Sequence, residues 1–492
     1  MAAAMEAEVL EPLALRYSDL LLLSSSPSGA SSLPSQELGR LESLSSRVME
    51  ALGPSGPGLL CVTDVPGAPA MCRALLPLAR KLALLAGCDR TRVLKSHGLG
   101  TDVPLKNPDR NVSSFAGQLK YTRDPSLEVH SSLAKHQHEN GHILEENRKD
   151  IQDVFDDSEF SQLGDAFKDL GFCMMELGLR LAQLCDSKMG SQELELSMLE
   201  ACTAKGRLIH YHSNLDNVIL KEIKKRAKGS GRKPSVIHRS VPQGSRAVGM
   251  SNPLNSGKEL QNKQDGPKHL GGESNAVTVG CRTSLSDLWQ QWHYDYGIFT
   301  VLTSPMFLCL DDAPQADLNG TSCIPSSQEC SPPDGHTCLQ LLDSTANKVL
   351  MVKAPLESFI IQVGESADIL SNGRLRSTLH SVCRPAGLRG LSRETFVVFL
   401  QPAWDKTFSP PDHVLACGKE LASSEEVRAG HGEKNSSNFQ LMADENSYNL
   451  KEEILKAVPP LCSRLRASMT FAEFSRETTK QYYGGSGTQS IR

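Results

Sequence analysis

Two residue types that bind transition metals stand two positions apart in the segment Trp292-His293-Tyr294-Asp295. In a β-strand, residues i and i+2 point to the same face, so His293 and Asp295 would project together. A second imidazole from another strand would complete a 2-His-1-carboxylate facial triad, which binds non-haem Fe(II) and leaves positions open on the metal. The pair alone is a weak signal, because 14 histidines and 57 acidic residues in this chain give about 1.6 His-x-acid pairs by chance.

A downstream block supplies the missing imidazole. An apolar run over 358–363 ends at Gly364, the turn Ser371-Asn372-Gly373 follows, and His380 comes next. Asn-Gly is a strong tight-turn signal, so we expect His380 on a new strand. The other His-x-acid pair, His431-Gly432-Glu433, lies in a polar, Gly-rich stretch without strand character. The sequence therefore favours the pair at 293 and 295, with His380 as the third ligand.

A possible carboxylate-binding pair follows His380, the histidine furthest along the chain in the expected triad. Arg393 and Thr395 open the apolar run 396–400 and would share one face of a strand. A guanidinium beside a hydroxyl is well suited to holding a carboxylate.

Taken together, these motifs resemble the plant 2-oxoglutarate- and Fe(II)-dependent oxygenases related to isopenicillin N synthase. The resemblance implies an α+β fold with a double-stranded β-helix (jelly-roll) core, flanked by N-terminal and C-terminal helices and carrying long loop insertions. It implies that His293, Asp295 and His380 bind Fe(II) and are catalytic, while Arg393 and Thr395 hold the cosubstrate 2-oxoglutarate. The expected activity is a dioxygenase reaction that uses O₂ to hydroxylate or desaturate an organic small molecule.

The sequence departs from the family pattern in three places. Arg393 lies three residues further from the distal histidine than is usual, which leaves Arg384 and Arg389 open as alternative carboxylate partners. Thr395 stands where the family has Ser. His212 replaces a Tyr that commonly touches the cosubstrate, and because an imidazole can also donate a hydrogen bond, we expect His212 at the cosubstrate site.

Composition and periodicity divide the chain into regions with different expected structures. Apolar residues recur at helical spacing near 35–52, 70–85 and 159–184, and as short runs after residue 277. The expected strands are 59–62, 208–212, 296–302, 306–310, 349–353, 359–363, 367–369 and 396–400. The expected regions are a loosely ordered N-terminus (1–34), an N-terminal helical region (35–220), a basic disordered insertion (221–275), the oxygenase core (276–403, with a loop insertion at 311–337), and a polar loop with a C-terminal helix (404–492).

Bulk properties limit where the protein works and what it binds. The net charge of −5 gives no global attraction to nucleic acid, and no apolar run reaches the roughly 20 residues that span a bilayer. The 14 cysteines show no CxxC pair and no framework spacing, so we interpret them as reduced thiols of a cytoplasmic protein. The basic run between Lys224 and Lys233 leaves the nucleus open as a location, although a solvated loop is the simpler interpretation.

Three alternatives compete with these assignments. His136, His138 and His142 could suggest a metal site, but they lie in a polar segment without periodicity, which favours a solvated loop. A catalytically inactive or regulatory protein on the same scaffold is the main functional rival. An oxygenase directed to nucleic acid by the basic insertion ranks lowest of the three functions, below the active oxygenase and the inactive protein. It predicts salt-sensitive binding that disappears when residues 221–270 are deleted.

Overall fold

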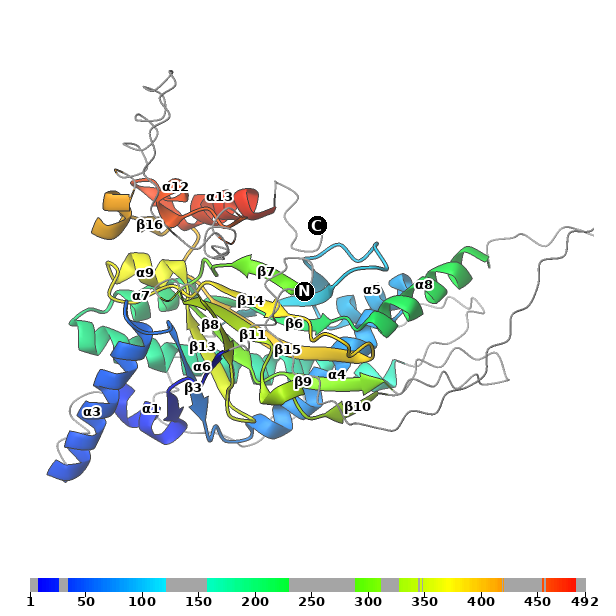
Figure 1. The fold of residues 1–492 in the computed structure, drawn as a ribbon, viewed down its shortest axis with the longest axis horizontal. Coiled ribbons are helices and arrows are strands. Elements are labelled where there is room, and N and C mark those ends of the chain that lie inside the picture. Colours follow the sequence, from blue (N-terminus) through cyan, green and yellow to red (C-terminus); the bar gives the residue numbers. More distant parts are fainter. Residues whose placement is uncertain are drawn as a thin grey trace, which may run out of the picture.

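The fold is α+β and is built around two β-sheets, as seen in a computed structural model of the chain (Figure 1). The structure describes residues 8–25, 34–120, 157–229, 288–310, 327–343, 346, 348–417, 419, 454 and 457–483.

The smaller sheet has five strands. In spatial order they are β1 (Glu8–Leu10), β12 (Lys348–Val352), β11 (Leu339–Asp343), β14 (His380–Cys383) and β7 (Leu288–His293). The larger sheet runs β2 (Ala14–Arg16), β3 (Leu59–Thr63), β13 (Phe359–Val363), β8 (Phe299–Thr303), β15 (Leu391–Leu400), β6 (Thr203–Tyr211), β5 (Val112–Lys120) and β4 (Gly100–Thr101). β9 (Met306–Leu310) continues beside β15 and pairs with β10 (Ser327–Cys330).

The chain alternates between the two sheets from β6 onward. β6 lies in the larger sheet, β7 in the smaller, β8 and β9 in the larger, β11 and β12 in the smaller, and β13, β14 and β15 alternate again. The inner strands of the two sheets are therefore β12-β11-β14-β7 and β13-β8-β15-β6. This alternation is the topology of a double-stranded β-helix, so the expected fold class is confirmed.

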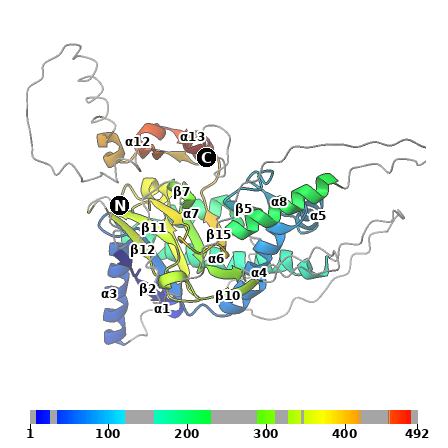
Figure 2. The ribbon, with the colours of Figure 1, turned by 45° about the vertical axis from the view of Figure 1, so that its right-hand side comes forward.

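Helices cover the outer face of the larger sheet (Figure 2). The principal ones are α3 (Ser35–Leu52), α4 (Ala68–Leu84) and α6 (Leu163–Met189), with α1 (Tyr17–Ser24), α5 (Gly87–Ser96), α7 (Glu193–Ala201) and α8 (Asn214–Gly229) around them. Their apolar faces and alternate side chains of the sheet form one core, in which the rings of Phe167 and Phe396 lie 4.8 Å apart. A second core fills the space between the sheets, so the strands of the larger sheet are buried on both faces.

The N-terminus contradicts the expectation that residues 1–34 are loosely ordered. Residues 8–10 and 14–16 form β1 and β2, which pair in parallel with β12 and β3. Three-residue strands carry almost no periodicity of their own. They form because the edge of each sheet supplies hydrogen-bonding partners, and that information is non-local.

The helical stretch at 214–229 corrects another boundary. Lys221–Gly229 extend helix α8 and do not begin a disordered segment, while residues 230–275 lie outside the described residues. The boundary at 220 also does not separate two folding units, since β3, β5 and β6 belong to the larger sheet of the core. Residues 367–369 form part of helix α9 (Glu365–Leu370) instead of the expected strand.

The C-terminal part packs across one end of the two sheets. It contains β16 (Thr407–Phe408), α12 (Leu461–Arg464), β17 (Met469–Thr470) and α13 (Phe471–Tyr483), which share a small apolar core. Arg464, fully buried, forms an ion pair with Glu365 of α9, and its Nη1 donates to Glu365 Oε2 at 2.8 Å. This buried pair fixes the C-terminal segment against helix α9.

The expectation that the cysteines are all reduced thiols is wrong for one pair. Cys309 of β9 and Cys330 of β10 form a disulfide, with their Cα atoms 6.1 Å apart. β10, with the 3₁₀ turn Pro333–Gly335, also gives structure to part of the expected loop insertion 311–337, of which 311–326 lie outside the described residues.

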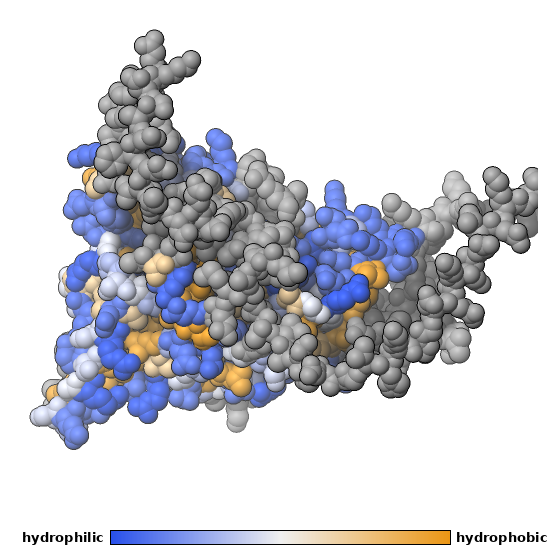
Figure 3. Space-filling model, viewed as in Figure 1, coloured by the Kyte–Doolittle hydropathy of each residue, from blue (hydrophilic) through white to orange (hydrophobic). Residues whose placement is uncertain are grey.

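In the view of Figure 3 most of the described surface is hydrophilic, with separate apolar areas between. The large exposed apolar side chains lie on different elements, among them Leu22, Leu356 and Trp404, which is ordinary for a protein surface. Within the described ranges, no helix combines the length and the apolar composition needed to cross a membrane.

Candidate metal centre

The three expected metal ligands converge at one end of the space between the sheets. His293 is the last residue of β7, and the strand register places it directly opposite His380, the first residue of β14. Asp295 Oδ1 lies 3.7 Å from His293 Nε2, and Asp295 Oδ2 lies 3.7 Å from His380 Nε2. The ligand atoms all lie within 4.8 Å of one another, so these three side chains could hold one metal ion.

Hydrogen bonds to both imidazoles leave the same nitrogen available for a metal. The Nδ1 atom of His293 lies 2.7 Å from the carbonyl oxygen of Gln291, and that of His380 lies 3.0 Å from the carbonyl of Thr378. A proton on each Nδ1 satisfies these carbonyls and leaves a lone pair on each Nε2. Burial lowers the pKa of His293 to about 4, helped by the neighbouring His380, so this imidazole is neutral at physiological pH.

Polar neighbours orient the other ligand atoms. Thr300 Oγ1 donates a 2.7 Å hydrogen bond to Asp295 Oδ2. The side-chain nitrogen of Gln290 lies 2.9 Å from His293 Nε2, and Tyr211 donates to Gln290 Oε1 at 2.7 Å. A metal at the triad would take the lone pair that the amide of Gln290 contacts here, so Gln290 has to turn away when the metal binds.

A backbone clamp holds the segment that carries Asp295. The amides of Glu365 and Ser366 donate to the carbonyls of Asp295 and Gly297 at 2.8 and 3.0 Å. Gly364, at the turn between β13 and α9, comes so close to this segment that a Cβ atom there would lie 2.2 Å from the carbonyl oxygen of Gly297. The glycine is required by close backbone approach, and its conformation is extended.

Replacing Gly364 by alanine is therefore expected to destabilise the protein by about 1–3 kcal/mol, the typical cost of overpacking. The added methyl meets backbone atoms that cannot rotate away, so it displaces the segment with Asp295 and also weakens metal binding. Urea unfolding of wild-type and variant protein measures the first effect, and metal titration measures the second. Gly39→Ala is the matched control, because nothing lies within 4 Å of that Cβ position in α3. A Gly364→Ala variant as stable as Gly39→Ala would show that the clamp is unimportant.

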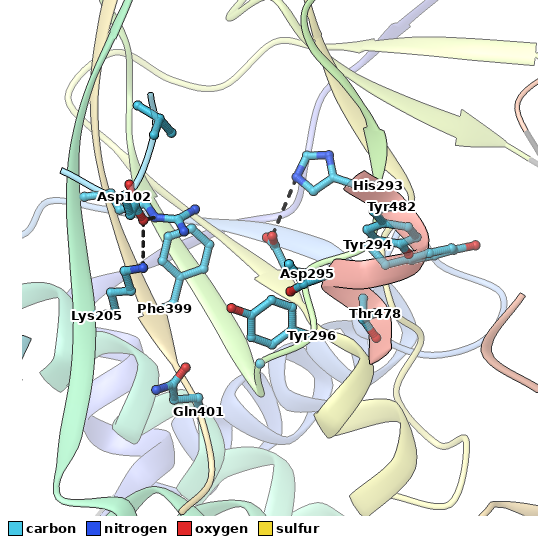
Figure 4. A pocket seen from close by; sticks show the side chains of 14 residues that line it. Asp102, Lys205, His293, Tyr294, Asp295, Tyr296, Phe399, Gln401, Thr478 and Tyr482 are labelled. Carbon is cyan, nitrogen blue, oxygen red and sulfur yellow. Dashed lines mark ion pairs between the residues drawn. The ribbon is translucent and has the colours of Figure 1, made fainter. Parts of the chain in front are cut away.

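Two cavities adjoin the triad, and His293 and Asp295 line both of them. The outer one, of about 180 Å³, is lined by His293 and Asp295, and across from them by Lys205 and Phe399 (Figure 4). Thr478 and Tyr482 of α13 close one side. The inner one, of about 40 Å³, lies between the two sheets; besides the three candidate ligands it is lined by, among others, Tyr211, Thr300, Arg393 and Val397.

Two cations and one carboxylate lie at the outer cavity. Asp102 Oδ2 lies 2.7 Å from Lys205 Nζ and 2.6 Å from Arg207 Nε. Burial raises the pKa of Asp102, but the two cations outweigh it and leave that pKa below its usual value. Arg207 also stacks on Phe399, with 4.9 Å between the guanidinium carbon and the ring centre. The wall opposite the triad is thus polar and aromatic.

Arg393 supplies a cationic group in the inner cavity. Its side chain is 2% exposed, its Nε donates to the carbonyl of Thr337 at 3.0 Å, and its guanidinium lies 5.0 Å from the ring centre of Tyr211. Its Nη1 atom is buried without a hydrogen-bond partner. A buried, unsatisfied guanidinium nitrogen is costly, and a carboxylate bound in this cavity would satisfy it. The residues present therefore fit a metal at the triad and a carboxylate at Arg393, since the triad and Arg393 both line this cavity.

The alternative arginines lie elsewhere. Arg384 donates to Asn111 Oδ1 at 3.0 Å and lies over Trp289, and Arg389 is exposed. Neither lines the two cavities.

Two of the expected cosubstrate contacts differ in the structure. Thr395 is buried, but its hydroxyl lies 3.3 Å from that of Thr303, and Thr395 does not line the inner cavity. The expected position of His212 at the cosubstrate site is wrong. Its ring packs against His210 on the opposite face of the larger sheet from the triad, and its Nε2 lies 2.8 Å from Ser113 Oγ. Tyr211, one residue earlier, lines the cavity instead. Strand parity was the available signal, because adjacent residues face opposite sides.

Comparisons with known proteins give structural matches alone. No family model matches the chain, and no curated protein matches it in sequence. Solved structures that align with it include JOX2 in complex with 2OG, Fe and JA (11% identity, TM-score 0.39, covering 83% of this chain and 80% of that one). A dioxygenase for auxin oxidation from rice aligns at 16% identity and a TM-score of 0.40, covering 84% and 96% of the two chains. A putative 2OG-Fe(II) oxygenase family protein from Caulobacter crescentus aligns at 13% identity and a TM-score of 0.39, covering 82% and 90%.

Proposed function

We propose that this chain is an Fe(II)- and 2-oxoglutarate-dependent dioxygenase that hydroxylates or desaturates an organic small molecule. One observation carries the proposal: a 2-His-1-carboxylate set and a buried guanidinium with an unsatisfied nitrogen lie in the same cavity. His293, Asp295 and His380 would hold Fe(II) on one side, which leaves the remaining positions of the metal for other ligands. Arg393 would hold the distal carboxylate of 2-oxoglutarate.

The chain's own contribution is binding, orientation and exclusion of water. When bound, the iron and cosubstrate supply oxidative decarboxylation coupled to removal of hydrogen from the substrate. The apolar residues of the inner cavity, such as Val397 and Leu302, limit water around the metal, while Thr300 and the two backbone carbonyls fix the ligand rotamers. The outer cavity, between the triad, Lys205 and α13, is the place for the organic substrate.

Release of succinate from 2-oxoglutarate tests the proposal. The purified chain is incubated with Fe(II), 2-oxoglutarate and O₂, and succinate is measured beside a His380→Gln variant. We expect slow release by the wild-type chain even without substrate, and none by the variant. If the chain binds iron and 2-oxoglutarate but releases no succinate with any substrate tried, the inactive or regulatory alternative is correct.

A further inference from the structure

Two histidines and an aspartate form a second cluster on the outer face of the larger sheet. His210 and His212 are two residues apart, with ring centres separated by 4.2 Å, at and just after the end of β6. Asp216 lies in the first turn of α8. All three side chains are fully buried, and their potential ligand atoms lie within 4.8 Å of one another. Because Tyr211 between the two histidines faces the inner cavity, this cluster is on the opposite side of β6 from the iron triad.

Hydrogen bonds fix the orientation of both rings. His210 Nδ1 lies 2.8 Å from Glu394 Oε1, and Ser392 also donates to this carboxylate. His212 Nε2 lies 2.8 Å from Ser113 Oγ, whose other partner is the guanidinium of Arg110. The opposite nitrogens are buried as well: His212 Nδ1 has no hydrogen-bond partner, and His210 Nε2 makes no hydrogen bond but lies 3.5 Å from Asp216 Oδ2.

The carboxylate of Asp216 is held just as firmly. Its Oδ2 accepts hydrogen bonds from the amide and the hydroxyl of Ser213 at 2.9 and 2.6 Å, while the amide of Asp216 donates back to the Ser213 hydroxyl at 3.0 Å. This reciprocal arrangement caps helix α8. Arg80 of α4 donates to Oδ1 at 3.0 Å, so Oδ2 is the oxygen that lies 3.5 Å from His210 Nε2.

We propose that His210, His212 and Asp216 form a second metal site, which binds a zinc ion through these three side chains. Two imidazoles and a carboxylate are a ligand set that zinc accepts. Glu394 bonded to the far nitrogen of His210 is the carboxylate–histidine arrangement that orients metal-binding imidazoles. The site would connect β6 with α8 through its ligands and β15 through Glu394. It is independent of the function proposed above.

The competing occupant of this cluster is a proton. Glu394 Oε1 lies 2.8 Å from Nδ1 of His210 and Asp216 Oδ2 lies 3.5 Å from its Nε2, so the two carboxylates could hold a doubly protonated imidazole in place of a metal. A zinc ion that carries one hydroxide has the same single positive charge as that proton. Exchange between the two would therefore leave the net charge of the buried cluster unchanged, with Arg80 still paired to Asp216.

Zinc content of the full chain distinguishes the two occupants. The reference is the chain with His293→Ala and His380→Ala, which cannot use the first triad. It also carries His136→Gln, His138→Gln and His142→Gln, which remove the histidine cluster outside the described residues. It is expressed with added zinc, dialysed against metal-free buffer and analysed by elemental mass spectrometry. We expect about one equivalent of zinc per chain, lost when His212→Gln is added.

A folded reference chain that holds no zinc overturns the proposal and leaves the proton as the occupant. Zinc that persists after His212→Gln also overturns it, because the metal is then bound elsewhere. If His212→Gln does not fold, cobalt substitution of the reference chain decides instead. Visible absorption bands of tetrahedral Co(II) with nitrogen and oxygen ligands support the site, and their absence contradicts it.

Discussion

Replacing His293, Asp295 or His380 by alanine, one at a time, is expected to abolish iron binding and succinate release while the chain stays folded. Each variant removes one of three ligand atoms that lie within 4.8 Å of one another, and two ligands do not hold Fe(II) in an open site. Even substitutions around a metal ligand typically cost 10- to 100-fold in affinity or activity, so loss of a ligand should exceed about 100-fold. Iron per chain and succinate per minute are the two measurements.

The matched control is a histidine outside both cavities near the triad. His413 pairs with Asp368 at 3.2 Å, its side chain is 49% exposed, and His413→Ala should leave iron content and turnover unchanged. Circular dichroism and thermal unfolding check that each variant is folded. Iron content and succinate release that survive in all three ligand variants would refute the assignment of the metal centre.

The triad could be found from the sequence because its geometry is local or set by strong turn signals. His293 and Asp295 come close together as expected, although β7 ends at His293 and Asp295 is held beyond the strand by the backbone of Glu365. Asn372 and Gly373 have φ values of 51° and 77°, which is the left-handed turn geometry that their sequence favours before the strand of His380. The sequence does not contain the distance between the two histidines, which depends on the register of β7 and β14.

Regular elements with strong internal patterns were also predictable. The helix at 35–52 and the strands at 306–310 and 359–363 have the bounds expected from their apolar spacing. The helix at 367–369 could not be predicted, because an apolar run this short fits a helix turn as well as a strand. The strand at 112–120 was missed because Ser113, Ser114 and Gly117 give it a polar composition, although two of these side chains are buried in the sheet.

The error at His212 has a specific cause. A shift of one residue along a strand moves a side chain from one face of the sheet to the other. A motif comparison can therefore identify the correct strand and still predict the wrong face for a residue. Tyr211 lies in the inner cavity with its ring 5.0 Å from the guanidinium of Arg393, while His212 lies with His210 among the outer helices. The paired registers Arg393 with Tyr211 and Val397 with Arg207 make the parity of β6 unambiguous once β15 is placed beside it.

Arg393→Ala is expected to raise the concentration of 2-oxoglutarate needed for half-maximal succinate release by about 10- to 100-fold. A hydrogen bond to a charged group contributes about 1.5–3 kcal/mol, and the guanidinium has one buried nitrogen still without a partner. Iron content should not change, because Arg393 is not among the three ligands. This combination separates loss of a cosubstrate contact from damage to the metal centre.

Two further variants make the interpretation specific. Arg393→Lys keeps the charge but loses the planar pair of donors. We therefore expect its half-maximal 2-oxoglutarate concentration to lie between those of the wild type and Arg393→Ala. Arg384→Ala should leave the requirement unchanged, because that guanidinium donates to Asn111 and Asn214 outside the two cavities. If Arg393→Ala leaves the half-maximal 2-oxoglutarate concentration unchanged and Arg384→Ala raises it, then Arg384 is the residue that binds the carboxylate. Of the three candidate arginines, only Arg393 lines the inner cavity beside the triad. We therefore expect the half-maximal 2-oxoglutarate concentration to rise in Arg393→Ala and to stay the same in Arg384→Ala.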